Sequence, residues 1–348
     1  MSLFRKTMGF AAIAMSLLLA GCNDNRPQSE QIGYRGVGMV QTTLPATEAA
    51  KRAANVVPEA EASADNDGPR MSDNPDYKNI KVLGDLSEAQ FTRTMVAITA
   101  WVAPEQGCAY CHNVENMADD GLYTKVVARK MLQMTRHINA DWSPHVGQTG
   151  VTCYTCHRGN NIPAQVWYEN PGPQVPLGML GNHAGKNMPS TAAGLASLPY
   201  DPFTPLLSQT TKENLIRVNG VEALAPGGPG KTIQQTERTY ALMVHMSNSL
   251  GVNCTFCHNA DAFSSWENSP PQRVTAWHGI RMVRDINGEY ITPLASVFPD
   301  KRLGTLGDPA KVFCATCHQG VNKPLYGVSM LKDYQVELGG KTAAATKP

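Results

Sequence analysis

The chain has 348 residues, enough for one large domain or two of ordinary size. Hydrophobic residues make up 42% and charged residues 17%, a balance typical of a globular protein. The formal net charge of +1 counts against a nucleic-acid binder, which needs a basic surface to neutralise phosphates.

The N-terminus has the plan of a secretory signal. Arg5 and Lys6 precede an apolar run at 8–20, and small residues stand directly before Cys22. This pattern is typical of lipoprotein signals, so residues 1–21 are predicted to be a signal peptide and Cys22 a lipid-modified N-terminus. The alternative is an uncleaved anchor, but about 13 apolar residues are few for a spanning helix. We therefore expect the mature chain outside the cytoplasm, held on a membrane by acyl chains.

Hydrophobic periodicity predicts four longer helices, at about residues 85–102, 122–138, 232–250 and 271–286. Each leads, after a turn or a loop, into a Cys-x-x-Cys-His motif. The predicted fold class is therefore mainly α with much irregular loop.

The four motifs use eight of the nine cysteines. In such a motif the two cysteines form thioethers with the vinyl groups of a haem, and the histidine binds the iron. Zinc or a redox disulfide is the alternative for a single copy, but four copies predict four covalently bound haem c groups. The predicted attachment residues are Cys108, Cys111, Cys153, Cys156, Cys254, Cys257, Cys314 and Cys317, with proximal ligands His112, His157, His258 and His318.

The segments between these motifs differ in character. Residues 22–84 predict an extended N-terminal arm, poorly ordered over part of its length at 48–70. Residues 159–231, rich in proline and glycine, predict a connecting segment that covers the haems or contacts a partner. Residues 341–348 predict a flexible tail.

The two helical parts of the chain match each other. Residues 85–158 and 232–340 each hold two motifs, and His-Ile-Asn at 137–139 parallels Asp-Ile-Asn at 285–287. The sequence therefore predicts a duplicated two-haem helical unit whose copies are related by a pseudo-twofold axis.

The second axial ligand of each iron sets its potential. A methionine there raises the potential, whereas a second histidine leaves it lower. Met95 and Met243 lie at matching places on the helices before the first and third motifs. A lone methionine on an apolar face is usually core packing, but recurrence in both halves makes these two candidate ligands.

The other two haems leave alternatives open. Met131 and Met134 share one helical face before the second motif, and the helix pattern does not choose between them. For the fourth haem the candidates are His145, in a loop after a proline, and its rivals Met282 and His278.

The order of these motifs, the methionine-bearing helices and the cysteine after the signal resemble the tetrahaem cytochrome subunit of purple-bacterial photosynthetic reaction centres. The resemblance covers nearly the whole mature chain. It is most specific in GQTGVTC at 147–153, CTFCHN at 254–259 and WHGIRMVRD at 277–285.

The resemblance implies three His/Met haems and one bis-histidine haem, lying in the order 1, 2, 4, 3. The distal ligands that it implies for haems 1 to 4 are, in turn, Met95, Met131, Met243 and His145. The remaining candidates Met134, Met282 and His278 then become packing residues.

The implied function is to re-reduce the photo-oxidised special pair with electrons from a soluble c-type cytochrome or a high-potential iron–sulfur protein. The protein would be an electron carrier and not an enzyme, bound to the reaction-centre core subunits on the periplasmic face of the photosynthetic membrane. A periplasmic multihaem reductase and a quinol-oxidising membrane tetrahaem cytochrome are the alternatives. The first requires an open iron position, and the second typically has bis-histidine haems and a true membrane helix.

Overall fold

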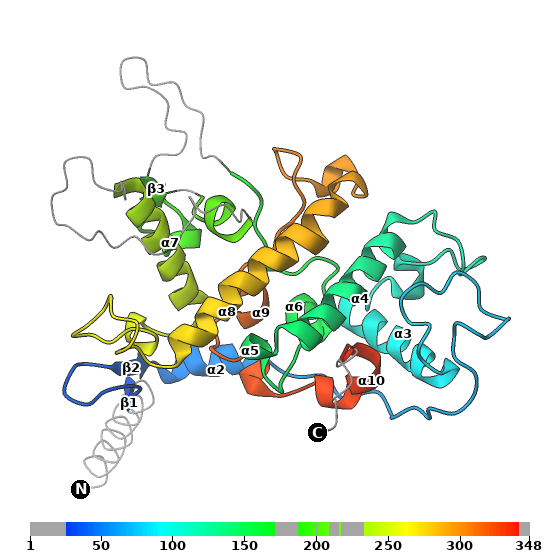
Figure 1. Cartoon of the computed structure of the whole chain (residues 1–348), viewed down its shortest axis with the longest axis horizontal. Helices are drawn as coiled ribbons and strands as arrows, with labels where there is room; N and C mark the ends of the chain where they lie inside the picture. The colour runs from blue at the N-terminus through cyan, green and yellow to red at the C-terminus, as the bar shows by residue number, and fades with distance from the viewer. Residues whose placement is uncertain (1–25, 171–186, 200, 209–215, 217–232, 341–348) are drawn as a thin grey trace, which may run out of the picture. The chain divides into compact units, whose positions relative to one another are not determined.

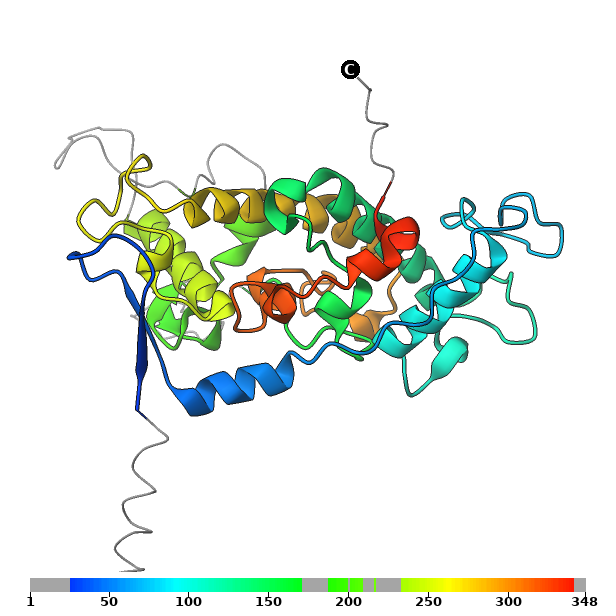
Figure 2. The same cartoon turned by 90° about the horizontal axis from the view of Figure 1, so that it is seen from below.

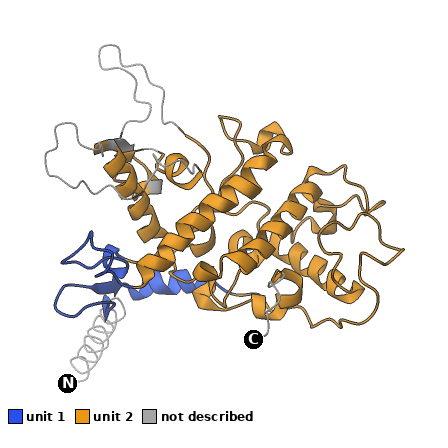
Figure 3. Ribbon diagram, viewed as in Figure 1, with its two compact units in different colours: residues 1–56, 253–270 blue, residues 57–252, 271–348 orange. Residues whose placement is uncertain are grey.

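The computed structural model describes residues 26–170, 187–199, 201–208, 216 and 233–340. The predicted signal peptide, the lipidation site Cys22 and the predicted tail lie outside the described residues. The chain forms two compact units (Figure 3): residues 1–56 with 253–270, and residues 57–252 with 271–348. The division into six segments expected from the sequence stays a prediction.

The first unit contains a hairpin, a helix and the third motif. Strand β1 (Gln28–Gln31) pairs antiparallel with β2 (Val40–Thr43), and the chain then enters α2 (Pro45–Ala54), as Figure 2 shows. Proline in the first turn suits a helix start because that turn needs no N–H donor, and the following residues are rich in alanine. The expected arm is therefore not extended throughout.

The second unit contains four longer helices, and their bounds agree with the predicted ranges to within three residues. They are α3 (Glu88–Val102), α4 (Tyr123–Asp141), α7 (Ile233–Leu250) and α8 (Gln272–Asp285). Helix α3 begins three residues later than predicted, at a capping box: the Ser87 hydroxyl accepts from the N–H of Gln90, whose side chain accepts from the N–H of Ser87.

Short elements complete the described part of the chain, which is mainly helical with little sheet, as predicted. The short α-helices are α5 (Ser143–Val146), α6 (Cys153–His157), α9 (Cys314–His318) and α10 (Gln335–Leu338). The second hairpin is β3 (Asn187–Pro189) with β4 (Ser197–Pro199). The tighter or wider turns are η1 (Gly107–Tyr110), η3 (Thr191–Ala193), η4 (Thr204–Ser208), η6 (Cys254–Phe256), η7 (Ile286–Ile291), η8 (Thr292–Ser296), η9 (Asp300–Arg302), η10 (Pro324–Gly327) and η11 (Leu331–Tyr334).

Separate apolar clusters hold the helices of the second unit together. Trp101 of α3 meets Tyr334 edge to face at 4.8 Å between ring centres, and this joins α3 to the C-terminal turns. Ile138 of α4 packs with Met282 and Ile286, which fixes α4 against α8 and η7. Burying each such side chain contributes about 1.5–3 kcal/mol. Figure 1 shows α5 beside α8, and α10 near α4.

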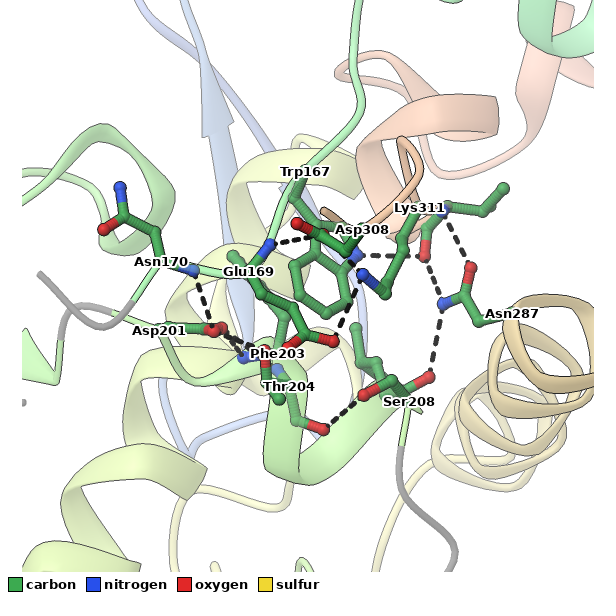
Figure 4. A network of polar contacts seen from close by, with 12 residues as sticks. Trp167, Glu169, Asn170, Asp201, Phe203, Thr204, Ser208, Asn287, Asp308 and Lys311 are labelled. Carbon is green, nitrogen blue, oxygen red and sulfur yellow. Dashed lines mark hydrogen bonds and ion pairs between the residues drawn. The ribbon is translucent and has the colours of Figure 1, made fainter. Parts of the chain in front are cut away.

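The described start of the connecting segment pairs with the backbone just before the fourth motif (Figure 4). Trp167 and Lys311 exchange backbone hydrogen bonds of 3.1 and 2.8 Å. The Lys311 ammonium is buried and contacts Asp308 at 2.6 Å and Glu169 at 3.2 Å. A buried charge is tolerable only when paired in this way, so these contacts fix the backbone that leads into α9.

No helix within the described residues is both long and apolar enough to cross a membrane.

Candidate metal centres

The four motifs take two local forms. In the first and third, the first cysteine lies on a short turn, η1 or η6, and the second cysteine directly follows it. In the second and fourth they lie on α6 and α9, where the hydroxyls of Thr155 and Thr316 accept from the backbone N–H that precedes each helix. Both of these helices end at a left-handed residue, Arg158 (φ 51°) and Gln319 (φ 48°).

Each of the four motif histidines makes the same type of hydrogen bond. In each ring Nδ1 lies 2.9–3.2 Å from a backbone carbonyl, at Met117, Asn160, Phe263 and Val321 in motif order. A carbonyl can only accept, so Nδ1 carries the proton and Nε2 is the unprotonated nitrogen. This is the arrangement in which a metal-binding histidine is oriented and its tautomer fixed.

His145 has the same arrangement although it belongs to no motif. Its Nδ1 lies 3.0 Å from the carbonyl oxygen of Thr275 on α8, which leaves Nε2 free. We expected it in a loop, but it lies on the short helix α5, because Pro144 suits the first turn of a helix. That helix packs against α8 and fixes where the ring lies.

The rings of His145 and His318 lie 6.0 Å apart between centres, at an interplanar angle of 67°. A metal-bound imidazole nitrogen lies about 2 Å from the ion and about 1 Å from its own ring centre, so two rings on opposite sides of one ion have centres about 6 Å apart. The observed separation therefore fits a single metal ion between them.

Burial keeps both of these histidines neutral at physiological pH. Desolvation, reinforced by His145, lowers the pKa of His318 to about 4. Desolvation also lowers the pKa of His145, although the bond to the Thr275 carbonyl opposes it. A neutral imidazole is the form that binds metal, so the pair is ready to act as ligands near pH 7.

The second and fourth motifs lie next to each other. The Sγ atoms of Cys156 and Cys317 are 2.7 Å apart, and α6 packs against α9. Both cysteines are free thiols in the structure. Groups attached through these two motifs would therefore be neighbours.

Comparison with known proteins identifies the family. The model of the photosynthetic reaction centre cytochrome C subunit matches residues 23–337. The chain is 50% identical over 323 residues to the photosynthetic reaction center cytochrome c subunit of Rubrivivax gelatinosus, covering 93% of this chain and 87% of that protein. The protein of the same name from Thermochromatium tepidum is 50% identical over 328 residues (94% and 79% covered). That of Roseobacter denitrificans is 38% identical over 339 residues (94% and 90% covered).

The chain belongs to the photosynthetic reaction centre cytochrome c subunits. The resemblance seen in the sequence is thus confirmed. Membership makes this protein a c-type cytochrome of photosynthetic electron transport with covalently bound haem c. The motif residues fit that group, because each pair of cysteines stands beside a histidine whose ring is oriented by a bond from Nδ1 to a backbone carbonyl.

In this reaction centre cytochrome c subunit, the structure places the candidate methionines as follows. Met95 of α3 is partly buried against the Trp101 cluster, and Met131 is partly buried beside Ile138. Met243 and the third motif lie in different compact units, so their pairing stays a prediction.

The rivals of these ligands also have positions. Met134 packs beside Met131, and Met282 is buried in the same cluster, 7% exposed. His278 is partly buried and contacts the neighbouring Trp277 edge to face. These surroundings suit packing roles.

Sequence reasoning did not find the carbonyl groups that orient the histidines. Every residue has a carbonyl, so no residue type marks such a position. The match between the two halves of the sequence paired Asn139 with Asn287 but gave neither residue a role. Asn139 exchanges two bonds with the backbone of Val151, at 2.8 and 2.9 Å, and Asn287 does the same with Val312, at 2.9 and 2.8 Å. Each asparagine thereby fixes the backbone just before a motif.

Proposed function

We propose that this protein re-reduces the photo-oxidised special pair of a photosynthetic reaction centre, with electrons from a soluble periplasmic donor. The donor is a c-type cytochrome or a high-potential iron–sulfur protein. The observation that carries the proposal is the set of five histidines whose Nδ1 donates to a backbone carbonyl, within a member of the reaction centre cytochrome c subunit family. Five such rings supply four proximal ligands and one distal ligand.

The protein holds four haem c groups, three with His/Met ligation and one with two histidines. The distal ligands of haems 1, 2, 3 and 4 are Met95, Met131, Met243 and His145, in that order. Each haem supplies an iron that alternates between the ferrous and ferric states. The chain holds the iron through thioethers and oriented imidazoles, and it sets unequal potentials through the choice of methionine or histidine.

The two-haem units are a duplication, and local geometry supports this. The histidines of the first and third motifs bond to a carbonyl five residues later, at Met117 and Phe263. Those of the second and fourth bond to one three residues later, at Asn160 and Val321. The adjacency of Cys156 and Cys317 supports the haem order 1, 2, 4, 3, in which haems 2 and 4 are neighbours.

The protein lies on the periplasmic face of the photosynthetic membrane, bound to the membrane subunits of the reaction centre. Its anchor is the lipid-modified Cys22, which follows the predicted signal peptide. The relatives named reaction center cytochrome c subunits support this placement.

Flash spectroscopy on native membranes during a redox titration tests the function. A flash bleaches the special pair. When the haems are poised reduced, haem oxidation must then accompany the recovery of the special pair. Absence of any haem signal at every poise contradicts the proposal. Rapid stoichiometric binding of carbon monoxide to the reduced protein would instead favour a multihaem reductase with an open iron position.

A further inference from the structure

Helix α8 lacks a side chain where the His145 ring lies. A Cβ atom added to Gly279 would stand 2.6 Å from His145 Cε1, 2.9 Å from Nδ1 and 3.1 Å from Nε2. Real Cβ atoms essentially never show contacts under 3.0 Å, and the first two distances lie below that limit. The imidazole therefore lies directly against the backbone of α8, in room that exists only because residue 279 is glycine.

No backbone requirement explains this glycine. It lies inside the regular helix α8, and its φ is not in the left-handed region where glycine is favoured. Glycine within a helix is destabilising relative to alanine. Space for the neighbouring ring is what this residue provides in return.

The same place in the first two-haem unit has a different occupant. Aligning Asn139 with Asn287, the two residues that fix the backbone before the second and fourth motifs, brings Met131 of α4 opposite Gly279 of α8. Met131 is the proposed distal ligand of haem 2. The helix that would bring the equivalent methionine to haem 4 thus has no side chain there.

The His145 ring lies against Gly279, where a side chain at position 279 would stand, and helix α8 orients it. Its Nδ1 donates to the carbonyl of Thr275, one turn before Gly279 on the same helix face. The His318 ring lies nearby, with 6.0 Å between the ring centres. Helix α8 therefore contacts the ring twice, with a carbonyl that orients it and a glycine that admits it.

We propose that Gly279 is a positioning residue that makes haem 4 a bis-histidine centre, by removing the local methionine and admitting His145 from α5. This inference rests on the proposed ligation of haem 4 by His145 and His318. Any side chain at position 279 displaces the ring from the iron.

The test compares Gly279→Ala with Gly288→Ala in the purified full-length holoprotein. Gly288 is the matched control, because it is exposed and a Cβ there would meet no atom within 4 Å. In Gly279→Ala we expect the low-spin bis-histidine signal of haem 4 to be lost from the electron paramagnetic resonance spectrum. We also expect carbon monoxide to bind to one reduced haem and the potential of that haem alone to shift. Gly288→Ala keeps all four haems unchanged. A Gly279→Ala protein with wild-type signals and potentials overturns the proposal.

A second variant covers the case in which Gly279→Ala does not mature. The double substitution His145→Gly with Gly279→Met removes the ring and restores a methionine on α8. We expect the near-infrared charge-transfer band of methionine-bound ferric haem to grow from three haems to four, and the potential of haem 4 to rise. A mature double variant whose band still corresponds to three haems overturns the proposal.

The variant His145→Ala separates this inference from the ligation on which it rests. If His145→Ala leaves every haem signal and potential unchanged, the proposed ligation itself fails. If it alters haem 4 while Gly279→Ala does not, only the role of Gly279 fails.

Discussion

His137 Nε2 lies 2.5 Å from Asp285 Oδ2, and these residues begin the two parallel segments at 137–139 and 285–287. The same carboxylate oxygen accepts from Trp142 Nε1 at 2.8 Å. The next residues, Ile138 and Ile286, pack in one apolar cluster. The two matching segments thus contact each other through their first two residues.

Replacing Asp285 by asparagine tests how much this contact stabilises the fold. Asp285 is partly buried and accepts from two side chains, so Asp285→Asn is expected to lower the free energy of unfolding by about 1–3 kcal/mol. The measurement is guanidinium unfolding of the holoprotein. The control Asp141→Asn removes the other carboxylate beside His137, which is 64% exposed, and is expected to cost less than about 1 kcal/mol. Equal losses in the two variants would contradict a special role for Asp285.

Replacing Asn287 by alanine tests how strongly this side chain fixes the backbone before the fourth motif. Asn287 is fully buried, donates to the carbonyls of Leu207 and Val312, and accepts from Val312 N–H. Asn287→Ala leaves these groups unpaired, and we expect a loss of about 2–3 kcal/mol in urea unfolding. Asn287→Asp loses the two donated bonds and buries a carboxylate against the same carbonyls, so it is expected to lose at least as much. A change below about 0.5 kcal/mol in Asn287→Ala would show that this backbone is fixed by other contacts.

The pH dependence of stability is expected to involve Asp120. A hydrogen-bonded ion pair with Arg129 and a bond from Asn79 hold the pKa of Asp120 well below its usual range, with further contributions from Lys81 and Lys125. A depressed pKa contributes stability above the unfolded-state value of about 3.9, and this contribution disappears as pH falls through the folded-state pKa.

Thermal unfolding of Asp120→Asn and the wild type from pH 7 to pH 2 measures this contribution. The Tm difference between them is expected to be constant at neutral pH and to shrink below about pH 4. Asp119→Asn is the control, because the carboxylate of Asp119 forms no ion pair with any described residue. A Tm difference that does not change with pH would exclude Asp120 as the titrating group.

Two neighbouring methionines on α4 separate ligation from packing. We expect Met131→His to lower the potential of haem 2 in a redox titration, because histidine replaces methionine as distal ligand. Met134→Leu, a swap of similar volume, is expected to leave all four potentials unchanged and to cost less than about 1.5 kcal/mol of stability. If instead substitution of Met134 lowers the potential of haem 2, the assignment must be reversed.

The membrane anchor depends on Cys22. Cys22→Ser removes the thiol that carries the lipid, so the protein is expected to leave the membrane fraction when the reaction centre is absent. Mass spectrometry of the N-terminus of the wild-type protein is expected to show acyl chains on Cys22. An unmodified N-terminal segment that still holds the protein on the membrane would indicate an uncleaved anchor.

Hydrophobic periodicity located α3, α4, α7 and α8, because each of these helices is long enough to carry its own apolar pattern. The same locality explains what was missed. Helix α5 is a single turn packed against α8, too short to show such a pattern, so His145 was expected in a loop.

The amino-acid sequence by itself determined the four motifs with their cysteines and histidines, since haem attachment depends on residues adjacent in the chain. It left open which residue faces His318. Only the tertiary structure brought His145 to that ring, because α5 and α9 come from distant parts of the chain and α5 is placed by packing against α8. The tautomer of each ring was likewise decided by backbone carbonyls, which every residue has and which only folding places. The role of Gly279 in admitting the His145 ring also depends on tertiary structure, because that ring comes from another helix.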